Sequence, residues 1–185
     1  QNAQDLQEAA KAAGIIADVV VDIDVIKRSG VLPGEPALAL AQMVDKMPNL
    51  RFRGILAYDG GVQHVKGFQN RKAKAIKNFE PVVETYEKMK AAGLNMEIFS
   101  GGGTGTYNIM SNFPGFTDVQ VGSYLFMDRQ YMVIGGANNE NVYDDFVPSL
   151  TVMTTIINTN HPGRLITDSG AKSLTLNRPK AMVIG

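Results

Sequence analysis

The chain has 185 residues, 44% of them apolar, and 18 basic residues balance 18 acidic ones. This composition allows a buried core, as one domain or one domain and part of another, and the balanced charge favours neither nucleic acid nor an anionic membrane. The chain has no cysteine, which excludes disulfides, thiolate metal sites and a cysteine nucleophile, and its two histidines, His64 and His161, are too few for a histidine-rich metal site. We therefore expect no nucleic-acid partner, no membrane partner and no metal ligand within this chain.

The N-terminus enters a helical pattern directly, with no initiator methionine. It lacks the basic and apolar regions of a signal peptide, and the chain has no apolar run long enough to span a bilayer. We expect a piece of a longer chain and a cytoplasmic location.

Helical and strand patterns alternate over the first half. A helix is predicted over residues 4–13, ended by Gly14, and the apolar run at 15–24 predicts a strand buried on both sides. A second helix is predicted over 36–47. Its expected inner face comprises Leu38, Leu40, Ala41, Met43 and Val44.

Residues 52–58 predict the next strand, and a long amphipathic helix is expected from 67 to 92. Pro81 lies inside this helix and is expected to kink it or to start a second one. The nearby basic residues are predicted to form its solvated face: Arg71, Lys72, Lys74 and Lys77.

Two further strands are predicted, over residues 96–100 and 118–122, with one or two helical turns at 106–112 between them. The alternation indicates an α/β fold with a parallel sheet, and both a barrel and an open sheet fit it. After Tyr131 the character changes, and strand-like runs at 147–158, 164–168 and 181–184 predict the start of a β-region.

Three consecutive glycines follow the strand at 96–100, within the run S-G-G-G-T-G-T at residues 100–106. Glycine allows another group to approach the backbone, so successive N–H groups here predict an anion site, with a phosphate as guest. The hydroxyls of Ser100, Thr104 and Thr106 would be further donors. A glycine-rich turn without a ligand is the alternative, and neither common nucleotide-binding fingerprint matches.

Polar clusters follow four of the predicted strands, at residues 22–28, 58–64, 100–106 and 122–124. The carboxyl ends of parallel strands meet at one edge of a sheet or barrel, where function collects. This convergence favours a ligand at the glycine loop.

Five segments resemble motifs of one enzyme family. Residues 22–31 (DIDVIKRSGV) resemble D-[IV]-D-x-G-x-x-R-x-G-V, residues 54–64 (GILAYDGGVQH) resemble G-x-x-A-Y-x-G-x-x-Q-H, and residues 100–106 resemble G-[GA]-G-T-G-T. Residues 119–128 (VQVGSYLFMD) resemble Q-x-G-S-Y-x-F-M-D, and residues 167–175 (TDSGAKSLT) resemble D-[AS]-G-x-K-[AS]-L. Together they resemble the D-threonine aldolase and eukaryotic-type D-serine dehydratase family, pyridoxal-phosphate enzymes with an alanine-racemase-like barrel.

The resemblance implies part of a (β/α)8 barrel over residues 1–135 and the start of a C-terminal β-domain over 136–185. It implies pyridoxal 5'-phosphate at the barrel mouth, with Arg28 as the catalytic residue and Gln63 and His64 on the substrate. The implied cofactor-binding residues are Tyr58, Ser100, Gly101, Gly102, Gly103, Thr104, Gly122, Ser123 and Tyr124. Alternatives stay open: Arg28 pairing with Asp24, Tyr58 as a core aromatic, and Gln63 and His64 only bonding the loop.

The implied activity is that of a lyase on D-3-hydroxy amino acids, with retro-aldol cleavage of D-threonine as the first candidate. Dehydration of D-serine or D-3-hydroxyaspartate is an alternative, and a non-catalytic pyridoxal-phosphate-binding barrel is another. The family's Schiff-base lysine and its ligands for a divalent metal (Mn, Mg or Zn) match no residue here. The first motif is also one residue short between Asp24 and Arg28, and Ile26 replaces its glycine. A homodimer is implied by analogy alone.

Overall fold

The fold was analysed in a computed structural model that describes residues 1–175 and 181–183. The chain divides into two compact units. Residues 1–65 and 69–121 form the first, and residues 66–68 and 122–185 form the second, of which 176–180 and 184–185 lie outside the description. Each unit is described by itself.

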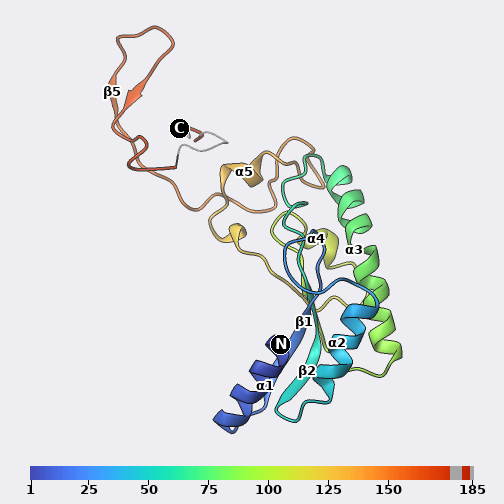
Figure 1. The fold of residues 1–185 in the computed structure, drawn as a ribbon. Coiled ribbons are helices and arrows are strands. Elements are labelled where there is room, and N and C mark those ends of the chain that lie inside the picture. The colour runs from blue at the N-terminus through green and yellow to red at the C-terminus, as the bar shows by residue number, and fades with distance from the viewer. Residues whose placement is uncertain (176–180, 184–185) are drawn as a thin grey trace. The chain divides into compact units, whose positions relative to one another are not determined.

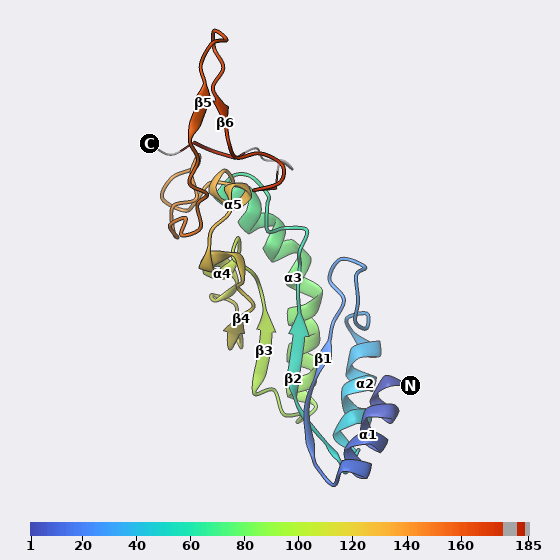
Figure 2. The same ribbon diagram turned by 90° about the vertical axis from the view of Figure 1, so that its left-hand side faces the viewer.

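The first unit alternates helices with the strands of a parallel sheet of order β1-β2-β3-β4 (Figures 1 and 2). Its elements are α1 (Asn2–Ala13), β1 (Ala17–Asp22), α2 (Glu35–Asp45), β2 (Leu50–Ala57), α3 (Phe68–Ala91), β3 (Ile98–Gly101), α4 (Tyr107–Met110) and β4 (Asp118–Val119). The predicted α/β class with parallel strands is confirmed. In Figure 2 the strands lie side by side, with α3 behind them.

The sheet requires a glycine on β2. The register between β1 and β2 shifts between Val19 and Val20, so Gly54 pairs with Val20. Gly54 has φ +140°, and a Cβ there would lie 1.9 Å from the Ile98 carbonyl oxygen of β3. Only glycine lets β3 pair this closely beside the irregularity.

The core lies between the sheet and the helices. Ile55 and Phe99 of the strands are fully buried, and the ring of Tyr86 from α3 stacks on Phe99 with centroids 5.0 Å apart. Phe116 packs on the same ring at 4.3 Å. Each large apolar side chain buried in this way contributes roughly 1.5–3 kcal/mol, so α3 is held by an aromatic layer rather than by its own helix propensity.

The prediction that the first strand is buried on both sides is wrong. Val21 is 4% exposed, whereas Val20 is 36% exposed and Asp18 is also exposed. The face with Asp18 carries ion pairs to Arg51 and Arg53 of β2, so it is a polar surface of the sheet. The run at 15–24 contains Asp18, which marks this polar face, but both faces of the strand also carry valine, so the apolar content of the run predicts burial on both sides.

The predicted inner face of the second helix is partly wrong as well. Ala41 and Val44 are buried as expected, but Met43 is 39% exposed and Ala37 is buried instead. The buried residues are spaced four and three apart, and Met43 falls outside this stripe.

One continuous helix of 24 residues runs through Pro81, so the alternative of a second helix starting there is wrong. Pro81 has no N–H for the carbonyl of Lys77, and both residues are exposed, so water can take the place of the lost bond. Thr85 donates its hydroxyl to the Pro81 carbonyl at 2.6 Å, one turn further on.

The second unit contains the short 3-10 helix η1 (Ser123–Leu125), α5 (Arg129–Met132) and the antiparallel pair β5 (Ile156–Asn158) and β6 (Ile166–Thr167). Asp128 caps α5, since its carboxylate accepts the N–H groups of Gln130 and Tyr131. The strand predictions at 147–158 and 164–168 are thus correct only at 156–158 and 166–167. Residues 181–183 form no strand, and Ile184 lies outside the described residues.

In the part of the chain that the structure describes, no helix is both long enough and apolar enough to cross a membrane.

Candidate functional site

The glycine stretch forms a compact buried turn between β3 and α4. All residues from Ser100 to Thr106 are buried, and Gly102 has φ +65°. The Gly103 N–H donates to Thr106 Oγ1 at 3.1 Å, and the Thr106 N–H donates to the Gly103 carbonyl at 2.9 Å. The turn is therefore stabilised by its own hydrogen bonds.

The groups that approach Gly103 and Gly105 in this structure come from the loop after β2. A Cβ on Gly103 would lie 2.8 Å from both Tyr58 Oη and Gln63 Oε1. A Cβ on Gly105 would lie 2.1 Å from the Gln63 carbonyl oxygen. The glycines therefore do allow other groups to approach the backbone closely, and at Gly103 and Gly105 those groups are Tyr58 and Gln63 of the same chain.

Tyr58 links two of the predicted site residues. The guanidinium carbon of Arg28 lies 5.6 Å from the centroid of the Tyr58 ring, while the phenol oxygen lies against Gly103. Tyr58 is half-buried. The structure thus brings together Arg28, Tyr58 and the glycine loop, which come from the ends of three neighbouring strands.

The phenol of Tyr58 is held in its neutral form. Burial raises its pKa above the ordinary value of 10.0, the Arg28 guanidinium lowers it, and the Asp59 carboxylate raises it again. At neutral pH Tyr58 therefore presents an O–H that can donate a hydrogen bond beside the glycine loop.

Arg28 does not depend on Asp24 as an ion-pair partner in this structure. The Asp24 carboxylate accepts the backbone N–H groups of Ile26 and Arg28, each at 3.1 Å. Arg28 Nε donates to Ser29 Oγ at 3.3 Å, and that hydroxyl donates to Asp22 Oδ2 at 3.1 Å. Asp24 shapes the loop, and the exposed guanidinium extends over Tyr58.

The short loop before Arg28 carries backbone strain at Lys27, which has φ +60°. A left-handed conformation at a residue with a long side chain is uncommon and costs free energy. Lys27 lies in the segment between Asp24 and Arg28, which is one residue shorter than the motif it resembles.

Gln63 is 2% exposed, and its amide is bonded within the chain at both ends. Its Nε2 donates to the Asp59 carbonyl at 2.9 Å and to Thr106 Oγ1 at 3.0 Å, and its Oε1 accepts the Gly105 N–H at 3.0 Å. His64, the next residue, is exposed. Gln63 therefore joins the loop after β2 to the glycine loop.

Ser100 lies at the carboxyl end of β3, where its hydroxyl donates to Asp118 Oδ1 and accepts from Gln120 Nε2 at 3.0 Å. These hydrogen bonds join β3 to β4 and to the residue that follows β4. Gly122, Ser123 and Tyr124 belong to the second unit, where the Tyr124 ring packs on Phe146 at 5.6 Å. Their approach to the glycine loop stays a prediction.

The sequence interpretation missed two groups on α3. Arg71, predicted on the solvated face, is 0% exposed, and its Nε donates to the Gly105 carbonyl at 2.6 Å. Asn78 Nδ2 donates to Asp59 Oδ2 at 2.7 Å. A signal was present for Arg71, because it falls on the same helical stripe as the buried Ala75 and Phe79.

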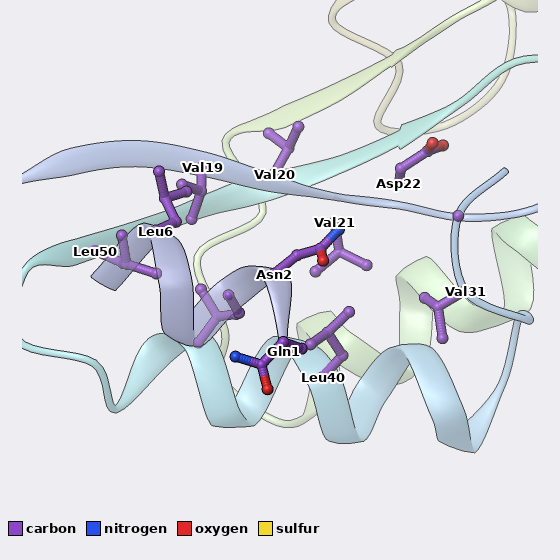
Figure 3. Close-up of a pocket in the computed structure, with 13 residues that line it drawn as sticks. Gln1, Asn2, Leu6, Val19, Val20, Val21, Asp22, Val31, Leu40 and Leu50 are labelled. Atoms are coloured by element: carbon purple, nitrogen blue, oxygen red, sulfur yellow. The ribbon is translucent and has the colours of Figure 1, made fainter. Parts of the chain in front are cut away.

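A separate pocket of about 500 Å³ lies beside α1, β1 and α2 (Figure 3). Leu6, Val19, Val21, Leu40 and Leu50 form most of its apolar wall. Its lining includes none of Arg28, Tyr58 and the glycine loop, so it is distinct from the site described above.

The first 130 residues match the family model of the alanine racemase N-terminal domain. The chain is 34% identical over 187 residues to a 3-hydroxy-D-aspartate aldolase of Paracoccus denitrificans (strain Pd 1222), covering 100% of this chain and 48% of that protein. It is 35% identical over 179 residues to a D-threonine aldolase of an Arthrobacter species, covering 94% of this chain and 46% of the relative.

A solved structure agrees with these matches. The fold resembles a D-threonine aldolase of Filomicrobium marinum, with a TM-score of 0.80 and 33% sequence identity, over 95% of this chain and 46% of that one. The chain spans about half the length of the curated relatives it matches. On the family match, the sequence identities and the shared fold, this chain belongs to the alanine racemase N-terminal domain family.

Proposed function

We propose that the full-length protein is a pyridoxal-phosphate-dependent lyase that cleaves D-3-hydroxy amino acids to glycine and an aldehyde. The observation that carries the proposal is the grouping of Arg28, Tyr58 and Gly103 at the carboxyl ends of β1, β2 and β3. The similarity to two aldolases of D-configured 3-hydroxy amino acids supports it. D-Threonine is the first candidate substrate, and 3-hydroxy-D-aspartate is the second.

The chemistry of these residues fits the cofactor. A guanidinium over a phenol ring suits a planar anionic partner, and a glycine turn lets a phosphate approach the backbone. We assign the phosphate to Gly101, Gly102, Gly103 and Thr104, and by the family resemblance Gly122, Ser123 and Tyr124 are further cofactor-binding residues. The bound cofactor supplies an electron sink for negative charge at the substrate Cα.

The chain's own residues have distinct parts in this proposal. Arg28 binds the substrate carboxylate or the phenolic oxygen of the cofactor, because its guanidinium is exposed beside Tyr58. Tyr58 donates its hydroxyl proton as a hydrogen bond. Gln63 fixes the glycine loop through Gly105 and Thr106, while the exposed His64 faces substrate.

The wider organisation is part of the same proposal. Residues 1–135 belong to the barrel and 136–185 begin the β-domain, in a homodimer. A divalent metal would polarise the substrate hydroxyl, and the described residues include no cluster of three or more His, Asp or Glu side chains that could hold one.

The first prediction concerns Arg28. In the full-length enzyme, Arg28→Met should lower kcat/KM for D-threonine by roughly 100-fold or more, as loss of a charged group acting at the reacting centre does. Glycine release from D-threonine and from 3-hydroxy-D-aspartate measures the activity. Lys27→Met, which removes a cation from the same loop, is the matched control and should stay near wild type.

Several outcomes contradict the proposal. An Arg28→Met variant as active as Lys27→Met would remove Arg28 from the site. Release of ammonia in place of glycine would identify the dehydratase alternative. A full-length protein that binds the cofactor without turning over either substrate would support the non-catalytic alternative.

A further inference from the structure

Arg71 is a buried cation on α3 that joins two loops of the candidate site. Its side chain is 0% exposed. Nε donates to the Gly105 carbonyl at 2.6 Å, and Nη1 donates to the Val65 carbonyl at 2.9 Å. Removing a guanidinium from water costs free energy. A buried arginine is therefore expected where its fixed N–H donors hold other groups in a particular geometry.

Gly105 is held from both sides. Its N–H donates to Gln63 Oε1 at 3.0 Å, and its carbonyl accepts from Arg71. A Cβ on Gly105 would lie 2.1 Å from the Gln63 carbonyl oxygen, so the fit requires glycine. The peptide groups on either side of Gly105 therefore have fixed orientations before any ligand arrives.

We propose that Arg71 is a positioning residue for the phosphate-binding loop. A carbonyl oxygen engaged by the guanidinium cannot turn toward a phosphate, which it would repel. Arg71 thereby fixes the peptide that follows the Gly101–Thr104 segment, the segment to which the proposed function assigns the phosphate. This inference rests on the proposed function, since it takes the glycine loop as the phosphate site.

A role in folding alone is the competing explanation, and two related compounds separate the two. Pyridoxal 5'-phosphate and pyridoxal share the ring and the aldehyde and differ in the phosphate ester. A positioning role predicts that loss of Arg71 weakens binding of the phosphorylated compound selectively. A role in folding alone affects both compounds equally.

The test measures the affinity of the cofactor-free full-length protein for both compounds by equilibrium dialysis. In Arg71→Met, affinity for pyridoxal 5'-phosphate should fall roughly tenfold or more, as expected for loss of a charge-assisted hydrogen bond, while affinity for pyridoxal changes less than about twofold. Lys72→Met, at the exposed neighbouring position, is the matched control and should change neither affinity. Circular dichroism confirms that each variant is folded.

A second variant covers the case in which Arg71→Met does not fold. Arg71→Lys keeps the charge but has no planar fork of donors, so its preference for the phosphorylated compound should be intermediate. A folded variant with the wild-type preference overturns the proposal, and so does unfolding of both variants. If instead the wild-type protein binds neither compound, the proposed function itself has failed.

Discussion

Tyr58 is the residue through which the candidate site is connected, because its ring contacts Arg28 and its hydroxyl lies against Gly103. Burial raises its pKa and Arg28 lowers it. Replacing Arg28 by methionine removes the lowering effect, so the pKa of Tyr58 should rise further. Since the neutral phenol is favoured in the folded state, Tyr58 also makes folding less stable as pH rises above the ordinary tyrosine pKa.

Ultraviolet titration of phenolate formation measures the predicted rise in the pKa of Tyr58. The difference between the wild type and Tyr58→Phe identifies the signal of Tyr58 among the tyrosines. Lys27→Met should leave the Tyr58 titration in place. A titration that Arg28→Met leaves unchanged or moves to lower pH would show that the guanidinium does not stay over the ring in solution.

At the same scale, the sequence predicted that the segments of Arg28 and Tyr58 lie close together, and their roles in the site stay a prediction, whereas the burial of Arg71 was not predicted. Tyr58 directly follows β2 and Arg28 lies in the loop after β1, and because parallel strands end at a common edge, the meeting of the two residues is a consequence of topology. Arg71 was assigned to solvent because three lysines follow within six positions. Its guanidinium is paired with the carbonyls of Val65 and Gly105, and the Gly105 carbonyl is brought to α3 only by the tertiary fold.

Among the elements, β1, β2 and the start of β3 share a ladder of ion pairs on the exposed face of the sheet. Asp18 pairs with Arg51 and Arg53, and Arg53 also donates to Glu97 at 2.7 Å. Hydrogen bonding from Arg51 lowers the pKa of Asp18, and hydrogen bonding from Arg53 lowers that of Glu97. Because both pKa values are depressed in the folded state, the stabilisation is present above the ordinary carboxyl values and is lost as pH falls from them through the lower folded-state values.

The double variant Asp18→Asn with Glu97→Gln should therefore show a flatter loss of unfolding free energy below about pH 5 than the wild type. Urea unfolding over that pH range measures the difference, with Glu8→Gln on α1 as an exposed-carboxyl control. High salt should shrink the difference, because exposed pairs are screened. Parallel pH profiles for the wild type and the double variant would mean that the ladder contributes nothing.

The sequence pattern predicted the helices and strands more reliably than it predicted which of their faces are buried. All four strands of the parallel sheet and the long helix were predicted. The sequence left open whether Pro81 kinks this helix or starts a second one, because the cost of proline depends on whether water reaches the freed carbonyl of Lys77. Two-sided burial of β1 was wrong because the ionic partners of Asp18 lie on another strand.

For the molecule as a whole, two regions of the described residues bear on ligand binding: the buried glycine loop, to which the phosphate is assigned by proposal, and the apolar pocket of Figure 3. Binding to the native state stabilises it, by about 2.7 kcal/mol at a ligand concentration 100 times Kd. Slower amide hydrogen exchange identifies where the bound ligand acts.

In the full-length protein, pyridoxal 5'-phosphate should slow hydrogen exchange in segments 58–63 and 101–106, which Gln63 and Arg71 hold together. Pyridoxal should protect the glycine loop less, because it lacks the phosphate. The strand β5, whose Ile156 and Ile157 are 53% and 63% exposed, serves as an internal control, and its exchange should be the same with and without ligand. Protection centred on Leu6, Val19 and Leu40 would instead place the ligand in the pocket beside α1 and contradict the assignment of the phosphate to the glycine loop.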